Sequence, residues 1–362
     1  MPRRPRTGFA GSRDAAAAVQ RAQGGVTLVP PAVSVLLPAF NAGATLPACL
    51  ASLRRQTLTD WECVLVDDGS TDDTPRIAAL AAATDSRIRV VTTPHRGLVA
   101  ALRRGLDACR GAIVARMDAD DLMHRDRLSA QAGVLDTDGS LAAVGCHVRM
   151  FPRAALTRRR RDYESWLNAI RTPQDVAREA LVECPIAHPA LAIRHHVLQA
   201  FGYADRAWAE DYDLVLRLLA AGRRIGTVPR RLVAWRDAPS RLSRVDARYS
   251  LDRFTACKAH YLAHGFLAGT DHYVLWGYGG TGRALRRALA QHRLLPSHIV
   301  EIKQTRLGQR IHGAPVITPG ELPALRGARI VVSVAFAGPR GDIRHALREM
   351  AFEEGRDFVC AA

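Results

Sequence analysis

Short apolar stretches alternate with amphipathic stretches along the first half of the chain. Buried strands are predicted for the mainly apolar stretches 33–37, 63–66, 88–91 and 112–115. Between the first two, Leu46, Leu50 and Leu53 recur at the spacing of one helical face. Strands that alternate with helices predict an α/β fold, with a mixed, largely parallel sheet flanked by helices.

Polar residues follow three of these predicted strands. Residues 38–41 follow the first strand, Asp67 and Asp68 follow the second, and Asp118 and Asp120 follow the fourth. In open α/β sheets, ligands bind beyond the carboxyl ends of the strands, and these ends lie along one edge. The sequence therefore predicts one nucleotide site to which all three clusters contribute.

The run Asp118-Ala119-Asp120-Asp121 is the most acidic of these clusters. In an extended segment, Asp118 and Asp120 project from the same side and Asp121 projects from the other. Two convergent carboxylates need a cation or a ligand, and hard oxygen atoms suit Mg²⁺ or Mn²⁺. An acidic surface loop is the alternative, because the pattern is short. The two neighbouring polar clusters favour a metal site at Asp118 and Asp120.

Acidic residues also open a later helix, which Gly222 ends. Carboxylates at Glu210, Asp211 and Asp213 suit the positive end of a helix dipole. A carboxylate at that point can also take the proton of an attacking hydroxyl group. His188, upstream, leaves two interpretations open: contact with a ligand, or a core histidine with protein partners.

Two basic stretches flank this part of the chain. Trp235 and Arg236 begin a loop rich in arginine and serine, which we expect to fold over a diphosphate or to lie on the surface. The four-arginine run 158–161 is interpreted as a solvated face, with contact to an anionic acceptor as the alternative.

The last hundred residues begin a new strand-and-helix series. A strand is predicted at 272–276, and Gly277, Gly279 and Gly282 form G-x-G-x-x-G before a helix. Acidic Glu301 ends the next predicted strand, as in dinucleotide-binding folds. A working nucleotide or dinucleotide site and a purely structural domain both stay open.

We therefore predict a flexible segment over 1–30, a first domain over 31–265 and a smaller, Rossmann-like α/β domain over 270–362.

The composition narrows the classes of partner and compartment. The net charge is +16, yet aromatic residues make up 6% of the chain and no basic stretch interleaves them, which argues against nucleic acid. The basic surface favours diphosphate ligands or peripheral contact with an anionic membrane. Seven cysteines without a C-x-x-C pair indicate a reducing cytoplasm, and no apolar run reaches the roughly 20 residues of a membrane span. We expect a cytoplasmic protein or one at the inner face of the membrane; the oligomeric state is not predicted.

Four stretches together identify a known family. VSVLLPAFNAG, VLVDDGSTDDT, RGLVAALRRGL and ARMDADD resemble, in order and spacing, a family 2 glycosyltransferase of the GT-A fold over residues 32–245. The resemblance implies a nucleotide-diphosphate sugar donor and a divalent cation held by the D-x-D. It implies that Pro38, Asp67 and Asp68 contact the nucleoside, without deciding which Asp reads the base.

The same resemblance assigns the catalytic base, and the residues around it complete the expected site. The pair at Glu210 and Asp211 supplies the catalytic base, and we prefer Asp211. The expected substrate-binding set is completed by residues within or beside the quoted stretches and near the acidic pair: Ala39, Asn41, Arg96, Ala119, His188, Trp235 and Arg236.

The resulting hypothesis is a metal-dependent, inverting and non-processive transferase. It would move a sugar, with UDP-sugars expected, to a saccharide or lipid-linked hydroxyl acceptor in bacterial polysaccharide or glycoconjugate synthesis. The chain lacks the Q-x-x-R-W sequence of processive members. One alternative is a sugar-nucleotide pyrophosphorylase, although those enzymes place a basic, glycine-rich loop where this chain has PAFNAG. The other is a non-catalytic nucleotide sensor.

Overall fold

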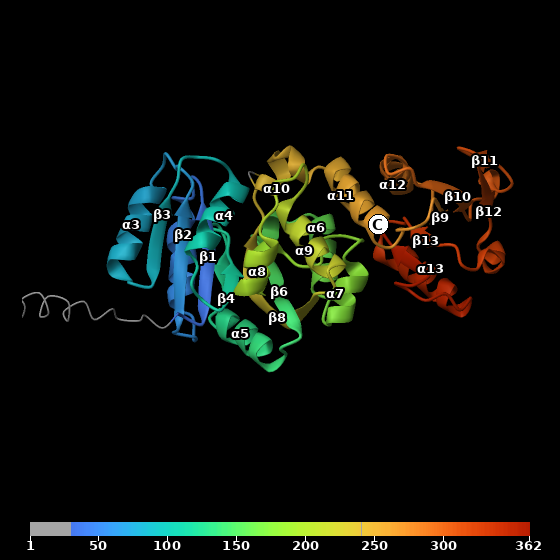
Figure 1. Cartoon of the computed structure of the whole chain (residues 1–362). Helices are drawn as coiled ribbons and strands as arrows, with labels where there is room; N and C mark the ends of the chain where they lie inside the picture. Colours follow the sequence, from blue (N-terminus) through green and yellow to red (C-terminus); the bar gives the residue numbers. More distant parts are fainter. Residues whose placement is uncertain (1–29, 240) are drawn as a thin grey trace, which may run out of the picture. The chain divides into compact units, whose positions relative to one another are not determined.

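The computed structural model describes residues 30–239 and 241–362. The flexible segment predicted for 1–30 lies outside this part of the chain, apart from Pro30. Two β-sheets organise the described residues, one of eight strands and one of six (Figure 1). No helix in the described ranges is both long and apolar enough to cross a bilayer.

One half of the first sheet is parallel, as predicted. Its strands lie side by side in the order β3 (Ile88–Thr92), β2 (Trp61–Asp67), β1 (Val33–Ala39) and β4 (Ile113–Arg116). The helices that follow the first three strands along the chain are α2 (Leu46–Arg54), α3 (Thr74–Thr84) and α4 (Leu98–Ala108). Every residue of β1 and β2 is buried, as expected for parallel strands covered on both faces.

The other half makes the sheet mixed. Here β7 (Ala192–Arg194) pairs antiparallel with both β4 and β6 (Leu141–Phe151), whereas β6 pairs parallel with β8 (Arg224–Arg236). The edge strand β5 (Leu122–Met123) pairs antiparallel with the end of β8. This last pairing places Trp235 and Arg236 next to the acidic residues that precede β5. The helices of this half are α5 (Arg127–Thr137), α6 (Arg158–Leu167), α7 (Pro173–Glu179), α8 (His195–Phe201), α9 (Glu210–Ala220) and α10 (Leu242–Val245).

The sequence also predicts a short helix at 163–170, and this helix begins earlier than expected. Thr157 caps α6, its hydroxyl oxygen accepting the N–H of Arg160 at 3.3 Å, so the arginine run 158–161 forms the first turns of this helix. Side-chain periodicity alone missed this start because arginines do not mark an apolar face.

The second sheet contains five parallel strands and a short antiparallel one. Its order is β11 (Arg310–Ile311), β12 (Ala314–Ile317), β10 (Leu295–Val300), β9 (His272–Trp276), β13 (Ile330–Val332) and β14 (Phe358–Cys360). The accompanying helices are α12 (Gly280–Ala290) and α13 (Ala337–Glu349). The strand predicted at 272–276 is confirmed, and so is a second, smaller α/β part.

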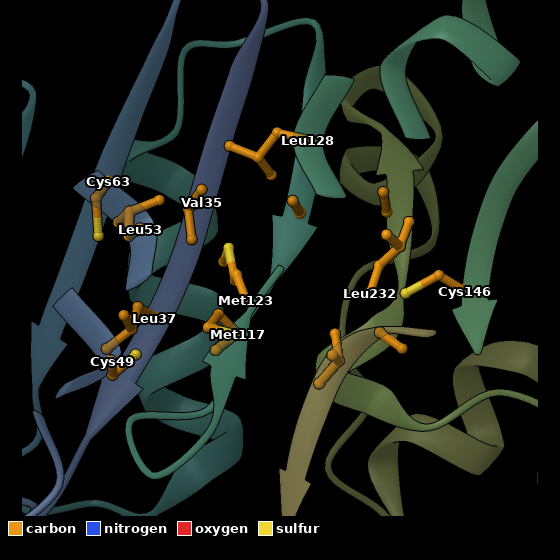
Figure 2. Packing of buried hydrophobic residues seen from close by; sticks show 14 of the residues in the cluster. Val35, Leu37, Cys49, Leu53, Cys63, Met117, Met123, Leu128, Cys146 and Leu232 are labelled. Atoms are coloured by element: carbon orange, nitrogen blue, oxygen red, sulfur yellow. The ribbon is translucent and has the colours of Figure 1, made fainter. Parts of the chain in front are cut away.

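The core of the first sheet lies on both of its faces. Along β1, Leu36 and Leu37 are both buried but belong to different apolar clusters, because neighbouring side chains in a strand point to opposite faces. Figure 2 shows the cluster that contains Leu37, with Leu53 of α2 and Met117 packed nearby. The helical face predicted from Leu46, Leu50 and Leu53 is therefore the one that α2 buries.

One helix joins the packing around both sheets. In α11 (Leu251–His264), Cys257 belongs to a core cluster of the first sheet, whereas Ala259 and Leu262 belong to one of the second. Residues 31–362 form one compact unit. The predicted division into 31–265 and 270–362 stays a prediction.

We expect Leu53→Ala to lower the free energy of unfolding by about 2–5 kcal/mol, because it leaves a cavity in a fully packed cluster. Leu80→Ala is the matched control, since Leu80 also lies in a helix but is exposed. Urea unfolding followed by circular dichroism measures both. Equal losses in the two variants would contradict the packing described for α2.

Candidate active site

A cleft of about 1000 Å³ opens beyond the carboxyl ends of the parallel strands. Pro38 and Ala39 at the end of β1, Asp68 after β2 and Asp118 after β4 all line it, so the predicted convergence of the three polar clusters is confirmed. Its lining also includes these predicted site residues: Asn41, Ala119, Asp120, His188, Glu210, Asp211, Trp235 and Arg236. Asp67 and Arg96 do not belong to this lining.

Residues 118–121 form a turn rather than an extended segment. The N–H of Asp121 donates to the carbonyl oxygen of Asp118 at 3.2 Å. As a result, one carboxylate oxygen from each of Asp118, Asp120 and Asp121 lies within 4.8 Å of the other two. The expectation that Asp121 points away was wrong, because the strand ends at Arg116 and the turn brings all three carboxylates together. We call residues 118–121 the acidic turn.

Two arginines hold the acidic turn in place. Arg116, 3% exposed at the end of β4, donates from Nη2 to Oδ1 of Asp118 at 2.6 Å. Arg236 donates its backbone N–H to Oδ1 of Asp121 at 2.6 Å and its Nε–H to the carbonyl oxygen of Asp120 at 2.7 Å. The predicted site residue Arg236 thus braces the turn from β8 with its backbone and its side chain. Oδ2 of Asp121 is buried without a hydrogen-bond partner in the described part of the chain.

The three carboxylates differ in how easily they ionise. Burial raises the pKa of Asp118, but the charges of Arg116 and Arg241 outweigh it and the pKa lies below the usual range. Burial and the nearby Asp118 carboxylate raise the pKa values of both Asp120 and Asp121. The charged forms of Asp120 and Asp121 are thus disfavoured beside Asp118, and a bound cation would stabilise them.

The two carboxylates at the start of α9 have different environments. Glu210 is 1% exposed; its Oε2 accepts the hydroxyl of Tyr249 at 2.7 Å, and its Oε1 lies 3.5 Å from Nδ1 of His188. Burial raises the pKa of Glu210, but the hydrogen bond and charge of His188 outweigh it and hold the pKa below the usual range. Glu210 is thus an ionised group with protein partners on both oxygens.

Asp211 is the less occupied of the two. In the described ranges, its side chain accepts only the N–H of Tyr212, at 2.7 Å. Burial and the neighbouring Glu210 charge raise the pKa of Asp211 to about 6. A carboxylate that lines a cleft and has a pKa near 6 is suited to accept a proton at neutral pH.

His188 has protein partners on both ring nitrogens. Its Nδ1 faces Glu210, and its Nε2 lies 3.3 Å from the hydroxyl oxygen of Tyr203. It is buried and also lines the cleft. These contacts favour the interpretation of His188 as a core histidine with protein partners. Its contact with Glu210 orients that carboxylate.

Asp67 and Asp68 stabilise turns next to the cleft. Oδ1 of Asp67 accepts the N–H of Ser70 at 3.0 Å, which accounts for its position outside the lining. Asp68 accepts the N–H groups of Arg96 at 3.0 Å and Gly97 at 2.9 Å. The exposed Arg96 therefore contributes its backbone to this arrangement. Asp68, which lines the cleft, fixes the loop before α4.

An aromatic pair that the sequence did not suggest lies at the same end of the cleft. The rings of Phe40 and His95 stack with centroids 3.9 Å apart and planes 18° apart, and both residues line the cleft. Phe40 is 46% exposed. An exposed, rigid aromatic face suits stacking on a planar ligand. The only signal in the sequence was the position of Phe40 directly after a strand.

The basic loop predicted after Trp235 borders the cleft. The guanidinium of Arg241 lies 4.4 Å above the ring of Trp235, and both line the cleft. Asp237 accepts hydrogen bonds from Arg160 at 2.8 Å and from Arg244 at 2.7 Å. The arginine run is therefore only partly a solvated face, because Arg160 anchors this loop.

The glycines of the second sheet serve close packing. A Cβ atom on Gly282 would lie 2.1 Å from the carbonyl oxygen of Gly277, whose φ is +95°, whereas one on Gly279 would meet nothing within 4 Å. Glu301, expected to face a ribose, is paired with Arg306 at 2.9 Å. Gly277 and Gly282 thus hold strand against helix, and Gly279 leaves the loop open to approach.

The chain matches the family model described as glycosyl transferase family 2 over residues 34–201. It is 31% identical to the chondroitin synthase of Escherichia coli over 206 residues, 53% of this chain and 27% of that protein. It is 30% identical to the amylovoran biosynthesis glycosyltransferase AmsE of Erwinia amylovora over 202 residues, 54% of this chain and 73% of that protein. The chain spans about a third or less of the first curated relatives that it matches.

Two solved structures share the fold. The S. aureus TarS fragment 1–349 in complex with UDP-GlcNAc matches with a TM-score of 0.51 and 17% identity, over 72% of each chain. The mannosyltransferase PcManGT of Pyrobaculum calidifontis, in complex with GDP-Man and Mn²⁺, matches with a TM-score of 0.50 and 22% identity, over 73% of this chain and 70% of that one. At these identities the likeness concerns the fold, which is GT-A. The similarity to AmsE, together with the family model, establishes that this chain belongs to glycosyl transferase family 2.

Proposed function

We propose that the protein transfers a sugar from a nucleotide-diphosphate sugar to a hydroxyl group of an acceptor. One observation carries the proposal: a single cleft contains an acidic turn suited to a cation and a separate carboxylate, Asp211, with a pKa near 6. Its volume of about 1000 Å³ is at the upper end of small-molecule sites. That volume is consistent with a donor and an acceptor bound together.

The nucleoside of the donor is assigned to the end of the cleft at Phe40. The exposed ring of Phe40, backed by His95, offers a flat face to a base, with Pro38 and Asn41 beside it. UDP-sugars are the first donors to test, because TarS of the same fold was solved with UDP-GlcNAc. GDP-sugars come second, because PcManGT was solved with GDP-Man.

A divalent cation, Mn²⁺ or Mg²⁺, fits the acidic turn. The turn offers hard oxygen ligands within 4.8 Å of one another, and the unpartnered Oδ2 of Asp121 is a buried acceptor that a cation would satisfy. Asp118 and Asp120 are the proposed ligands. A bound cation of this kind offsets the negative charge of a diphosphate. The protein itself supplies two further positive charges near Asp118, those of Arg116 and Arg241.

The proposed reaction is a single displacement with inversion. The acceptor oxygen forms a bond to the anomeric carbon while the bond between that carbon and the diphosphate oxygen breaks. The hydroxyl proton passes to the carboxylate of Asp211, which the ionised Glu210 beside it keeps basic. Tyr249 and His188 hold Glu210 in place. Asp211 is thus the proposed base, and Glu210 a positioning residue.

The acceptor is assigned to the wall formed by Asp211, Tyr249 and Lys258. We propose a saccharide or lipid-linked acceptor and non-processive transfer in polysaccharide or glycoconjugate synthesis, the process named for AmsE. The net charge of +16 supports peripheral contact with an anionic membrane at its cytoplasmic face. A pyrophosphorylase would instead form a nucleoside triphosphate from pyrophosphate, and a sensor would show no turnover.

A second candidate function belongs to the second sheet. A cavity of about 530 Å³ there is lined by Tyr278, Gly280, Arg283, Arg286, Arg287 and His312. Among the described residues, none of these three arginines forms an ion pair within 4.0 Å, so their positive charge is available to a phosphate. Because Glu301 is paired with Arg306, we propose a site for nucleotide phosphates and give up the role of Glu301 on a ribose.

We expect donor binding to require a divalent cation. Calorimetry with UDP-GlcNAc should show binding with Mn²⁺ that weakens at least about tenfold with EDTA or in Asp120→Ala, because the diphosphate would then face uncompensated carboxylates. Asp136→Ala, an exposed carboxylate on α5, is the matched control. Equal affinity with EDTA would refute the metal assignment; if UDP-GlcNAc does not bind at all, GDP-Man replaces it in the same design.

Asp211→Asn should leave donor affinity nearly unchanged and lower the transfer rate by about 10²-fold or more. In the wild type, the rate should fall about tenfold per pH unit below about pH 6, because Asp211 becomes protonated there, and should level off above it. Initial rates of release of the nucleoside diphosphate measure both effects. Transfer within a few-fold of wild type in Asp211→Asn, with loss in Glu210→Gln, would move the base to Glu210.

The double variant Arg283→Ala/Arg287→Ala should lose a second nucleotide-binding event. Asp120→Ala is expected to weaken nucleotide binding in the cleft. Calorimetry of that variant with UDP and with NAD should therefore report binding at the second sheet alone. Arg253→Ala, an exposed arginine on α11, is the control. The nucleotide site at the second sheet would be refuted if neither ligand bound to the folded Asp120→Ala variant, or if binding were unchanged in the double variant. The second sheet would then have a structural role only.

A further inference from the structure

Three histidines gather where α11 and α12 end. His260 and His264 lie on α11, and His292 lies two residues after the end of α12. Their ring centroids are 4.4 Å apart for His260 and His264, 5.6 Å for His264 and His292, and 6.1 Å for His260 and His292. None of the three lines the cleft or the cavity of the second sheet. We call these residues the histidine trio.

The backbone fixes where each ring starts. His260 and His264 are four residues apart in one helix, the spacing that places two imidazoles on the same face. His292 is held in a turn, its N–H donating to the carbonyl oxygen of Leu289 at 2.9 Å. The trio is therefore assembled from two segments that the fold has already packed, so a ligand need not order the chain to bind it.

The spacing of the rings matches that of imidazoles around one metal ion. With metal–nitrogen distances of about 2.0–2.1 Å and tetrahedral angles, three ring centroids lie roughly 5 Å apart, and the observed distances bracket this value. Nδ1 of His264 lies 2.7 Å from the carbonyl oxygen of His260, so its N–H donates there and leaves Nε2 as a ligand atom. Metal-binding histidines usually have such a backbone partner on the second nitrogen.

The rings need a small adjustment to bind one ion. Their nitrogens are not gathered as closely as the oxygens of the acidic turn. Binding one ion therefore requires the rings of His260 and His292 to rotate about χ2, a torsion with a broad energy profile. His264 is exposed, so a water molecule or an anion has access to a fourth position.

The charges around the trio permit a cation. An imidazole ring binds a metal ion in its neutral form. Arg206 lies within electrostatic reach of His260, but its Nε is 3.3 Å from the buried Asp213 carboxylate, which compensates its charge. Imidazole nitrogens without a carboxylate favour zinc and its neighbours over magnesium.

We propose that His260, His264 and His292 bind one borderline transition-metal ion, with Zn²⁺ as the model ion, at a site separate from the acidic turn. Such an ion would cross-link the end of α11 to the segment that follows α12. Helix α11 also contributes Phe254 and Lys258 to the cleft. The metal cross-link would therefore fix the helix that carries part of the proposed acceptor wall. The site does not require the proposed sugar transfer to be correct.

Isothermal titration with ZnCl₂ tests the proposal in the Asp120→Ala variant with excess Mg²⁺, which removes the acidic turn as a competing site. We expect one Zn²⁺ per chain with a dissociation constant of about 10 μM or tighter. His264→Ala and His292→Ala should each weaken binding at least about tenfold. His345→Ala, an exposed histidine on α13, should leave it unchanged.

Thermal unfolding gives a second readout that does not depend on the heat of binding. In the same Asp120→Ala background with excess Mg²⁺, Zn²⁺ should raise the melting temperature of the protein and of its His345→Ala derivative but not of its His264→Ala derivative. His264 is exposed, so its loss should not unfold the chain, and a circular dichroism spectrum verifies this. Binding only in the millimolar range, or equal affinity in His264→Ala, His292→Ala and His345→Ala, would overturn the proposal.

Discussion

The ion pair between Arg116 and Asp118 is the interaction on which the cleft depends. Arg116 is buried at the end of a core strand, and a buried charge is costly unless a partner lies close. Its guanidinium faces the acidic turn and also lies within electrostatic reach of Glu210. One arginine thus lets two groups of carboxylates share a small volume. A neutral residue there would leave both groups without their common counter-charge.

The acidic residues around the cleft fall into two functional kinds. Asp68 and Glu210 are held by several protein donors, and they fix a loop and a helix start. Asp120 and Asp211 have few protein partners and raised pKa values, so their oxygens are left for a ligand. The two kinds are connected. The hydrogen bonds to Glu210 fix its negative charge, and this charge is one cause of the raised pKa of Asp211.

The second sheet is tied to the first by polar contacts as well as by α11. Nη1 of Arg344 lies 2.8 Å from Oε1 of Glu179 in α7, and Nζ of Lys258 donates to the carbonyl oxygens of Val182 at 2.6 Å and Ala361 at 3.2 Å. Lys258 also lines the cleft. The region after the last strand therefore holds Lys258, a residue of the proposed acceptor wall, and this contact gives that part of the chain a structural role even without a ligand of its own.

The sequence by itself determined the local elements and the edge at which the site lies. Apolar periodicity placed the strands and the buried face of α2, and the end of a parallel strand is a site in any such sheet. The tertiary structure decided which polar groups are free. Whether Asp121 is held inward, whether Glu210 is already occupied, and whether Phe40 meets His95 depend on partners 39 to 115 residues away. Such pairings leave no periodic signal, because hydrogen bonds and ring stacking between distant segments form only once the backbone is folded.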